Sequence, residues 1–163
     1  MNYLFAPWRM AYIANNLKPD GCIFCEFPKS DKDDDHFILH RGNYSFIILN
    51  TFPYNSGDLM VAPYRHTGLY DDLTNEEILE INLLGSRCVK MMRTLMHPEG
   101  FNMGINMGKV AGAGYADHVH LHIVPRWNGD TNFMPVISDT RVVPEALSET
   151  FAKFKQYWNN HDS

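Results

Sequence analysis

Three histidines alternate with aliphatic residues in the segment His118–Ile123, and this pattern limits what the chain can fold into more than any other feature. A period of two residues is typical of a β-strand that presents apolar side chains to one face and polar ones to the other. The segment therefore predicts a strand with Val119, Leu121 and Ile123 in the core and the imidazoles on the opposite face. Pro125 lacks a backbone donor, so we expect the strand to end there or to lie at a sheet edge.

A glycine-rich run, Gly104–Gly114, precedes the histidines. Glycine permits backbone conformations in which successive amides converge on an anion. Neighbouring imidazoles on one strand face lie about 6.6 Å apart, which lets them surround one small polar group. Together the loop and the histidine row predict a phosphate-handling site. An edge strand with surface histidines, or a site for a metal ion alone, is the alternative.

A Cys-x-x-Cys pair, Cys22 and Cys25, stands near the start of the chain. Such a pair binds zinc when two more ligands are supplied, and His66 and His118 are available. The alternative is a pair of reduced thiols near the surface. A thioredoxin-like redox motif is disfavoured because no βαβ pattern surrounds the pair. Cys88 falls within a predicted helix and is expected in the core.

Length and composition predict a single domain over residues 1–163, with 1–20 as an N-terminal arm. The formal net charge of −5 argues against nucleic acid as a partner. No apolar stretch approaches the roughly 18 residues of a membrane span, and the start of the chain lacks the pattern of a signal peptide. An odd number of cysteines favours a reducing compartment, so we expect the cytoplasm.

The rest of the chain predicts an α+β fold: a mostly antiparallel five-stranded sheet with the histidine strand inside it, one long helix and a C-terminal helix. A capping box, Thr74–Glu77, opens the long helix, and Pro98–Gly100 ends it. The expected segments are a hairpin over 36–40 and 44–50, strands over 58–62 and 102–107, and a helix over 144–159 with Leu147, Phe151, Phe154 and Trp158 on one face.

The histidine segment matches the signature of the histidine triad (HIT) family, His-φ-His-φ-His-φ-φ, where φ is apolar. Other segments resemble the bacterial branch of diadenosine tetraphosphate phosphorylases and hydrolases: Phe5–Ile13, Asn50 with Pro53–Gly57, and Pro125–Trp127 with Asn132–Val136. The resemblance covers most of the chain. It implies a HIT-like fold and a homodimer in which the two sheets join into one layer.

The resemblance also implies roles for the three histidines. His120 is the nucleophile and becomes a nucleotidyl-histidine, His122 donates to a phosphate oxygen or the bridging oxygen, and His118 orients the strand. Further candidate substrate contacts are Asn50 for ribose, Asn106 with the amides around Gly112, Ala113 and Gly114 for phosphate, Lys109 and Arg126 for anionic groups, and Trp127 as a cover of the pocket.

Many bacterial HIT proteins, and the related galactose-1-phosphate uridylyltransferases, hold zinc with a cysteine pair and two histidines. The matching residues here are Cys22, Cys25, His66 and His118, so the resemblance implies a structural zinc and no organic cofactor.

Two departures from the family's pattern stand out. Many members carry Gln or Ser a few residues before the first triad histidine, whereas Gly112–Asp117 contains neither. Asp58 stands where a Gly-His pair is common, so the family gives no reason to expect a residue there to support the triad.

The expected function is cleavage of dinucleoside polyphosphates such as diadenosine tetraphosphate, with inorganic phosphate favoured over water as the acceptor. A hydrolase of nucleoside phosphoramidates or aminoacyl adenylates is one alternative. A nucleotide-binding regulatory protein without catalysis is another, although the intact triad favours an enzyme.

Overall fold

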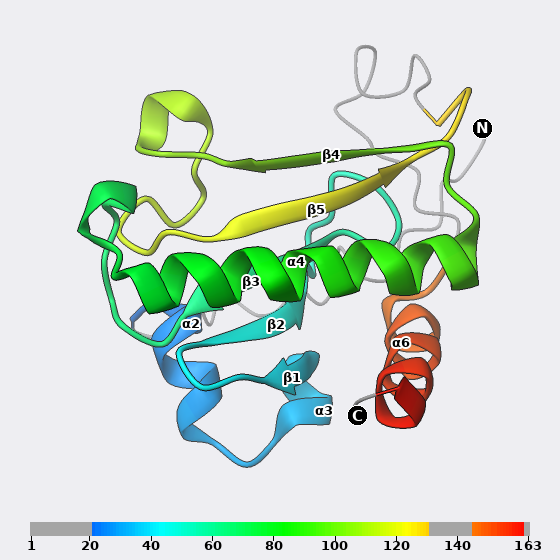
Figure 1. Ribbon diagram of the computed structural model, residues 1–163, viewed down its shortest axis with the longest axis horizontal. Helices are drawn as coiled ribbons and strands as arrows, with labels where there is room; N and C mark the ends of the chain where they lie inside the picture. Colours follow the sequence, from blue (N-terminus) through cyan, green and yellow to red (C-terminus); the bar gives the residue numbers. More distant parts are fainter. Residues whose placement is uncertain (1–20, 131–144, 162–163) are drawn as a thin grey trace, which may run out of the picture.

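The structure, a computed structural model, describes residues 21–130 and 145–161 (Figure 1). Five strands form one sheet in the order β1-β2-β3-β5-β4, and every neighbouring pair is antiparallel. The α+β fold and the antiparallel five-stranded sheet are therefore confirmed. The strands are β1 (Ile38–Arg41), β2 (Ser45–Leu49), β3 (Leu59–Pro63), β4 (Gly100–Ile105) and β5 (Leu121–Arg126).

The histidine segment leads into β5, which lies between β3 and β4 as expected. However, β5 continues through Pro125, so the prediction that this proline ends the strand was wrong. The alternative, an edge position, holds locally, because Pro125 pairs with β4 and has no partner residue in β3. The reason is the short ladder to β3, which stops where Leu59 pairs with Ile123. Beyond that point the side chain of Asn55 donates to the Pro125 carbonyl at 3.2 Å, and no strand there needs a donor from residue 125.

Several strand boundaries differ from the prediction by one to three residues. The largest difference is in the triad strand, because β5 begins at Leu121 and the segment 118–120 precedes it. A short helix, α3 (Asp33–His36), ends at Phe37 in the left-handed conformation with φ of 58°, so β1 begins two residues later than expected. The strand predicted over 102–107 is β4, which begins earlier because Gly100 already pairs with Arg126.

The long helix α4 (Asn75–Met96) lies across one face of the sheet (Figure 1). Its capping box is present: the Thr74 hydroxyl accepts from the Glu77 amide, and the Glu77 carboxylate accepts from the Thr74 amide. The helix ends at Met96, and the next residue, His97, is left-handed with φ of 48° and precedes Pro98. Both ends of the predicted helix are thus confirmed.

The C-terminal helix α6 (Leu147–His161) buries Phe151, Phe154 and Trp158 against the same core as α4. Its predicted first residue, Pro144, lies outside the described residues, as do the N-terminal arm 1–20 and the segment 132–136. The remaining short elements are α2 (Ile23–Glu26), η1 (Phe27–Lys29), η2 (Tyr70–Asp72) and η3 (Lys109–Ala111).

The sheet separates two apolar clusters of unequal size. The larger one lies between the sheet, α4 and α6 and includes Leu59, Met91 and Ile123. The smaller one lies on the opposite face, where Phe24 of α2 packs on Phe46, Ile48, Met60 and neighbouring side chains. Among the helices of the described residues, none has the length and apolar character to cross a membrane.

Candidate functional site

The three histidines of the predicted triad are brought together on the sheet face opposite α4. Val119, Leu121 and Ile123 alternate with them and belong to the α4-side core, as the period of two predicted. The imidazole face is not open to solvent, because His118, His120 and His122 are only 0%, 5% and 9% exposed. The rings of His120 and His122 lie 4.9 Å apart between centroids. These imidazoles therefore act in a water-poor environment.

His120 is held in one tautomer. Its Nδ1–H donates to the backbone carbonyl of His118 at 2.8 Å, which leaves the lone pair on Nε2. Burial lowers the pKa of His120 to about 4, so the imidazole is neutral near pH 7. A neutral imidazole with a fixed Nε2 lone pair has the form required of a nucleophile.

Phe24 covers the nucleophile candidate. Its ring stacks on that of His120, with centroids 4.6 Å apart and planes 30° from parallel, and it lies 5.2 Å from the ring of His118. Phe24 stands between the two cysteines of the Cys-x-x-Cys pair, on α2. The helix that carries the cysteines thus also carries the aromatic side chain above His120. The position of Phe24 between the two cysteines is evident in the sequence, but its contact with His120 was not predicted.

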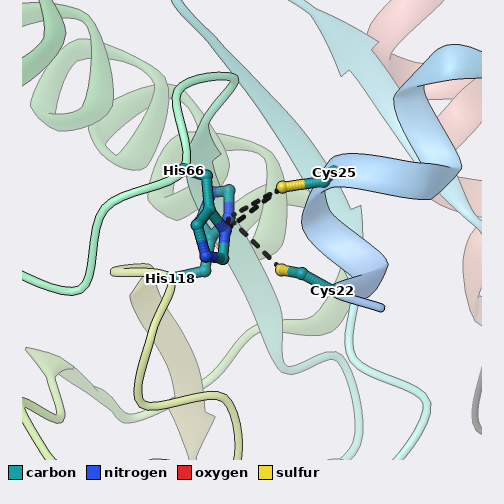
Figure 2. A group of neighbouring side chains, drawn as sticks. All are labelled: Cys22, Cys25, His66 and His118. Carbon is teal, nitrogen blue, oxygen red and sulfur yellow. Dashed lines mark hydrogen bonds between the residues drawn. The ribbon is translucent and has the colours of Figure 1, made fainter. Parts of the chain in front are cut away.

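The predicted metal ligands Cys22, Cys25, His66 and His118 meet at one point, with all four ligand atoms within 4.8 Å of one another. Figure 2 shows the two sulfur atoms pointing from α2 toward the imidazoles of two separate loops. The Sγ atoms lie 3.3 and 3.5 Å from Nδ1 of His118, and Nδ1 of His66 lies 3.3 Å from Nδ1 of His118. The structure therefore brings together the four residues that the sequence singled out.

These distances fit a tetrahedral cation. Zinc bonds of ordinary length give ligand separations of about 3.3 Å between two nitrogens and about 3.6 Å between nitrogen and sulfur. Nε2–H of His118 donates to the Pro63 carbonyl at 2.8 Å, which leaves the Nδ1 lone pair directed at the cluster. Burial and the neighbouring Cys22 raise the pKa of Cys25, so without a metal this thiol keeps its proton. A bound cation would supply the positive charge that stabilises both cysteines as thiolates.

An ion pair fixes the loop that carries His66. The neighbouring Arg65 binds the largely buried carboxylate of Glu77 at 2.8 Å and that of Asp72 at 2.7 Å. Because Glu77 also caps α4, this ligand loop is tied to the start of the long helix.

Asp58 contacts the triad, a role that was not predicted from the sequence. Its side chain is fully buried, and Oδ1 lies 3.3 Å from Nδ1 of His122. Its Oδ2 accepts from the side chain of Asn50 at 2.8 Å. The ring of Tyr54 lies edge-on to His122 at 5.2 Å. An acidic residue directly before an apolar strand was the available signal.

The predicted phosphate contacts lie near this end of the site, but their donors are partly in use. Asn106 donates to the Tyr54 hydroxyl at 3.2 Å. The amides of Gly112 and Ala113 donate to carbonyls of Lys109 and Gly108 at 3.0 and 3.3 Å, which closes turns within the loop. The glycine-rich loop is therefore folded on itself and does not direct both of these amides at a phosphate. Gly114 and Lys109 lie on the same exposed loop.

Arg126 ends β5 and Trp127 follows it, and both side chains already have partners within the chain. Arg126 binds the carboxylate of Asp130 at 2.6 Å and the side-chain oxygen of Asn102 at 2.6 Å. The indole of Trp127 donates to the Met96 carbonyl at the end of α4 at 3.4 Å. Arg126 is thus paired with a carboxylate and the Trp127 indole is bonded to the end of α4, and the anion contact of Arg126 and the pocket cover by Trp127 stay predictions.

Comparisons with known proteins agree with this geometry. A family model described as HIT domain matches residues 31–129. The chain is 35% identical to the AP-4-A phosphorylase of Mycobacterium tuberculosis, over 95% of this chain and 83% of that protein. It is similar to a Zn-bound histidine triad family protein from Mycobacterium smegmatis, with a TM-score of 0.70, 28% identity, and 87% of this chain and 96% of that chain covered. It is also similar to the diadenosine triphosphate hydrolase of Plasmodium falciparum, with a TM-score of 0.63, 30% identity and 82% of each chain covered.

Proposed function

We propose a function for this chain from the premise that it belongs to the HIT family, as the domain match and the 35% identical relative establish. The chain is an enzyme that cleaves dinucleoside polyphosphates such as diadenosine tetraphosphate by nucleotidyl transfer. The single observation that carries this proposal is His120, whose neutral ring has its Nδ1–H bound to the His118 carbonyl and its Nε2 lone pair free to attack.

The reaction has two displacements at one phosphorus atom. The Nε2 lone pair of His120 attacks the α-phosphorus, and the phosphorus–oxygen bond breaks with its electrons on the leaving nucleoside polyphosphate. In this proposal His122 supplies a proton to that oxygen. An acceptor oxygen then attacks the phosphorus and the phosphorus–nitrogen bond breaks, which returns the lone pair to His120. Asn106 and Lys109 are the proposed phosphate contacts, with Asn50 near the ribose.

Inorganic phosphate is the proposed acceptor. Diadenosine tetraphosphate then gives ATP and ADP, whereas attack by water gives ATP and AMP. The support is the phosphorylase from M. tuberculosis, which aligns along nearly the whole of this chain. Since water is far more concentrated than phosphate, this outcome requires a site that binds the anion in line and limits water, and the buried triad meets the second condition.

Chromatography of the products tests both statements. The protein is incubated with diadenosine tetraphosphate with and without millimolar phosphate. Predominant ADP with phosphate present supports phosphorolysis, and predominant AMP under that condition makes the enzyme a hydrolase. Turnover of a nucleoside phosphoramidate but not of the tetraphosphate would replace the proposal with the alternative expected from the family.

The metal proposed for the Cys22, Cys25, His66 and His118 cluster is zinc. Its support is the tetrahedral spacing of the ligand atoms and the Zn-bound HIT protein from M. smegmatis. A zinc ion here would fix α2 against the triad and add to folding stability. Because the site needs two reduced thiols, the proposal also places the chain in the cytoplasm.

A homodimer is proposed from the edge of the sheet. β4 is the outermost strand next to β5, and Met103 on it is 47% exposed. Leu79 and Leu83, one turn apart on α4, are 60% and 56% exposed. Light scattering on the purified chain tests this: a dimer is expected, and Leu83→Glu with Met103→Lys should yield monomers.

A further inference from the structure

Asp58, directly before β3, binds three groups at once although no part of the proposed function assigns it a role. Oδ1 faces Nδ1 of His122 at 3.3 Å. Oδ2 accepts from Nδ2 of Asn50 at 2.8 Å and from the backbone amide of Tyr54 at 3.1 Å. The carboxylate is fully buried, so these contacts replace its solvation.

Two of these donors cannot reverse their direction. The Tyr54 donor is a backbone N–H, which has no acceptor form. The amide of Asn50 is fixed because its Oδ1 already accepts from the Phe52 amide at 2.9 Å. Only the imidazole of His122 can exchange donor for acceptor, by moving its proton between Nδ1 and Nε2.

We propose that Asp58 is a positioning residue that holds a proton on Nδ1 of His122 and thereby makes Nε2 the atom that gives and takes the proton of the reaction. A carboxylate accepts at both oxygens, so the third contact is satisfied only when His122 donates from Nδ1. Nε2 then carries a lone pair in the neutral ring and an acidic N–H in the imidazolium. This inference rests on the proposed function for the reaction, but not for the tautomer.

The proton balance across the two displacements follows. The imidazolium of His122 gives its Nε2 proton to the leaving oxygen as the first phosphorus–oxygen bond breaks. The neutral ring, still with Nδ1–H on Asp58, then takes the proton of the attacking phosphate as the phosphorus–nitrogen bond to His120 breaks. His122 ends as it began, and Asp58 is never protonated.

The neighbouring strand leaves room for this exchange. Gly104 of β4 pairs with His122 in the register, and a Cβ at Gly104 would meet no atom within 4 Å. A substrate oxygen can therefore reach this flank of His122. Asp58 stands where a Gly-His pair is common in the family. A neutral histidine at this position could accept only one hydrogen bond, at one nitrogen. Asp58 accepts from three donors with its two oxygens, so it can hold His122 in a way that a histidine could not.

Asp58→Asn tests the tautomer directly. The amide oxygen of Asn must face the two fixed donors, so its NH₂ faces His122 and forces Nδ1 to accept. We expect His122 to change from the Nδ1–H to the Nε2–H tautomer. Nitrogen NMR of protein labelled at histidine, recorded over a series of alkaline pH values, measures this change of tautomer. His122→Gln assigns the resonance, and Asp33→Asn, an ion-paired aspartate on α3, is the control that should change nothing.

Kinetics separate a positioning role from a structural one. Asp58→Asn should lower kcat by about 10²- to 10⁴-fold with KM within about threefold of the wild type, because the base at Nε2 is lost. In a His122→Gln background, Asp58→Asn should change kcat by less than about threefold. Losses that multiply in the double variant would overturn the proposal.

The wild-type protein alone also decides the matter. If Asp58→Asn does not fold, an Nδ1–H resonance for His122 in the wild type supports the inference, and an Nε2–H tautomer overturns it. A wild-type protein that cleaves no dinucleotide, but in which His122 changes tautomer on Asp58→Asn, would remove the proposed function and leave this inference standing.

Discussion

The two faces of the sheet use the same strands but are held together by different kinds of interaction. On the α4 face, apolar side chains from four strands and two helices pack around residues such as Met91 and Ile123, both fully buried. The opposite face has a smaller apolar cluster under Phe24, beside the triad, Asp58 and the cysteine–histidine group. The comparison teaches that stability is concentrated on one face and chemistry on the other, so substitutions should separate the two.

Met91→Ala should have the largest effect on stability. Met91 is fully buried on α4, so removal of its side chain leaves a cavity and should lower the free energy of unfolding by about 2–5 kcal/mol. Urea denaturation measures this. Met107→Ala, at an exposed methionine, should stay within about 0.5 kcal/mol. Since no described residue of the α4 face is a proposed metal ligand, folded Met91→Ala should hold as much metal as the wild type. A loss of metal in this variant would contradict the separation of stability and chemistry between the two faces.

Removal of the cysteine ligands should affect the histidine face first. Cys22→Ser with Cys25→Ser should abolish metal binding and lower Tm by about 5 °C or more, because metal binding adds to the free energy of folding. Elemental analysis and calorimetry measure the two effects. Cys88→Ala, at the buried cysteine of the α4 face, is the matched control that should keep about one metal per chain. If removal of metal with a chelator left the Tm of the wild-type protein unchanged, or if the purified wild-type protein held no metal, the zinc proposal would be contradicted.

Phe24→Leu should lower activity more than stability. Leucine keeps most of the apolar volume but loses the ring stacked on His120, so we expect kcat to fall about 3- to 10-fold with metal content retained. Phe27→Leu is a close control, since Phe27 stacks on His36 outside the site, at 4.1 Å and 9°. Equal losses of kcat in both variants would show that the Phe24 stack has no special role.

Substitutions of the two candidate cations should have the smallest effects and sharpen the map of the site. Arg126→Lys should leave KM for diadenosine tetraphosphate within about twofold, because Arg126 is bound to Asp130. Lys109→Ala should raise this KM by about threefold, as expected for an exposed cation near a phosphate. Steady-state kinetics measure the KM of both variants. A larger rise in KM for Arg126→Lys than for Lys109→Ala would show that Arg126 contacts the substrate.

Much of the fold and the centre of the site could be predicted because they follow from local patterns. The alternation around His118–Ile123 fixes which side chains share a face, and the Thr74 capping box fixes where α4 begins. The prediction of the four metal ligands depended on the family resemblance, since no spacing in the sequence alone links Cys22 to His66.

The features that could not be predicted depend on contacts between distant segments. The part of Asp58 depends on β3 lying beside β5, and the pairing of Arg126 with Asp130 depends on how the chain turns after β5. Likewise, Pro125 is tolerated inside β5 because β3 begins only at Leu59, opposite Ile123, and this register cannot be read from the sequence.

The covalent intermediate on His120 is the central claim, and rapid quenching followed by mass spectrometry tests it most directly. Wild-type protein is mixed with diadenosine tetraphosphate without added phosphate, quenched at alkaline pH and digested. The account predicts a peptide containing His120 that is heavier by one adenylyl group and that disappears when phosphate is added. His120→Ala should show no such peptide and no turnover while still binding nucleotide. A folded His120→Ala with near-normal turnover, or an adenylyl group on another residue, would contradict it.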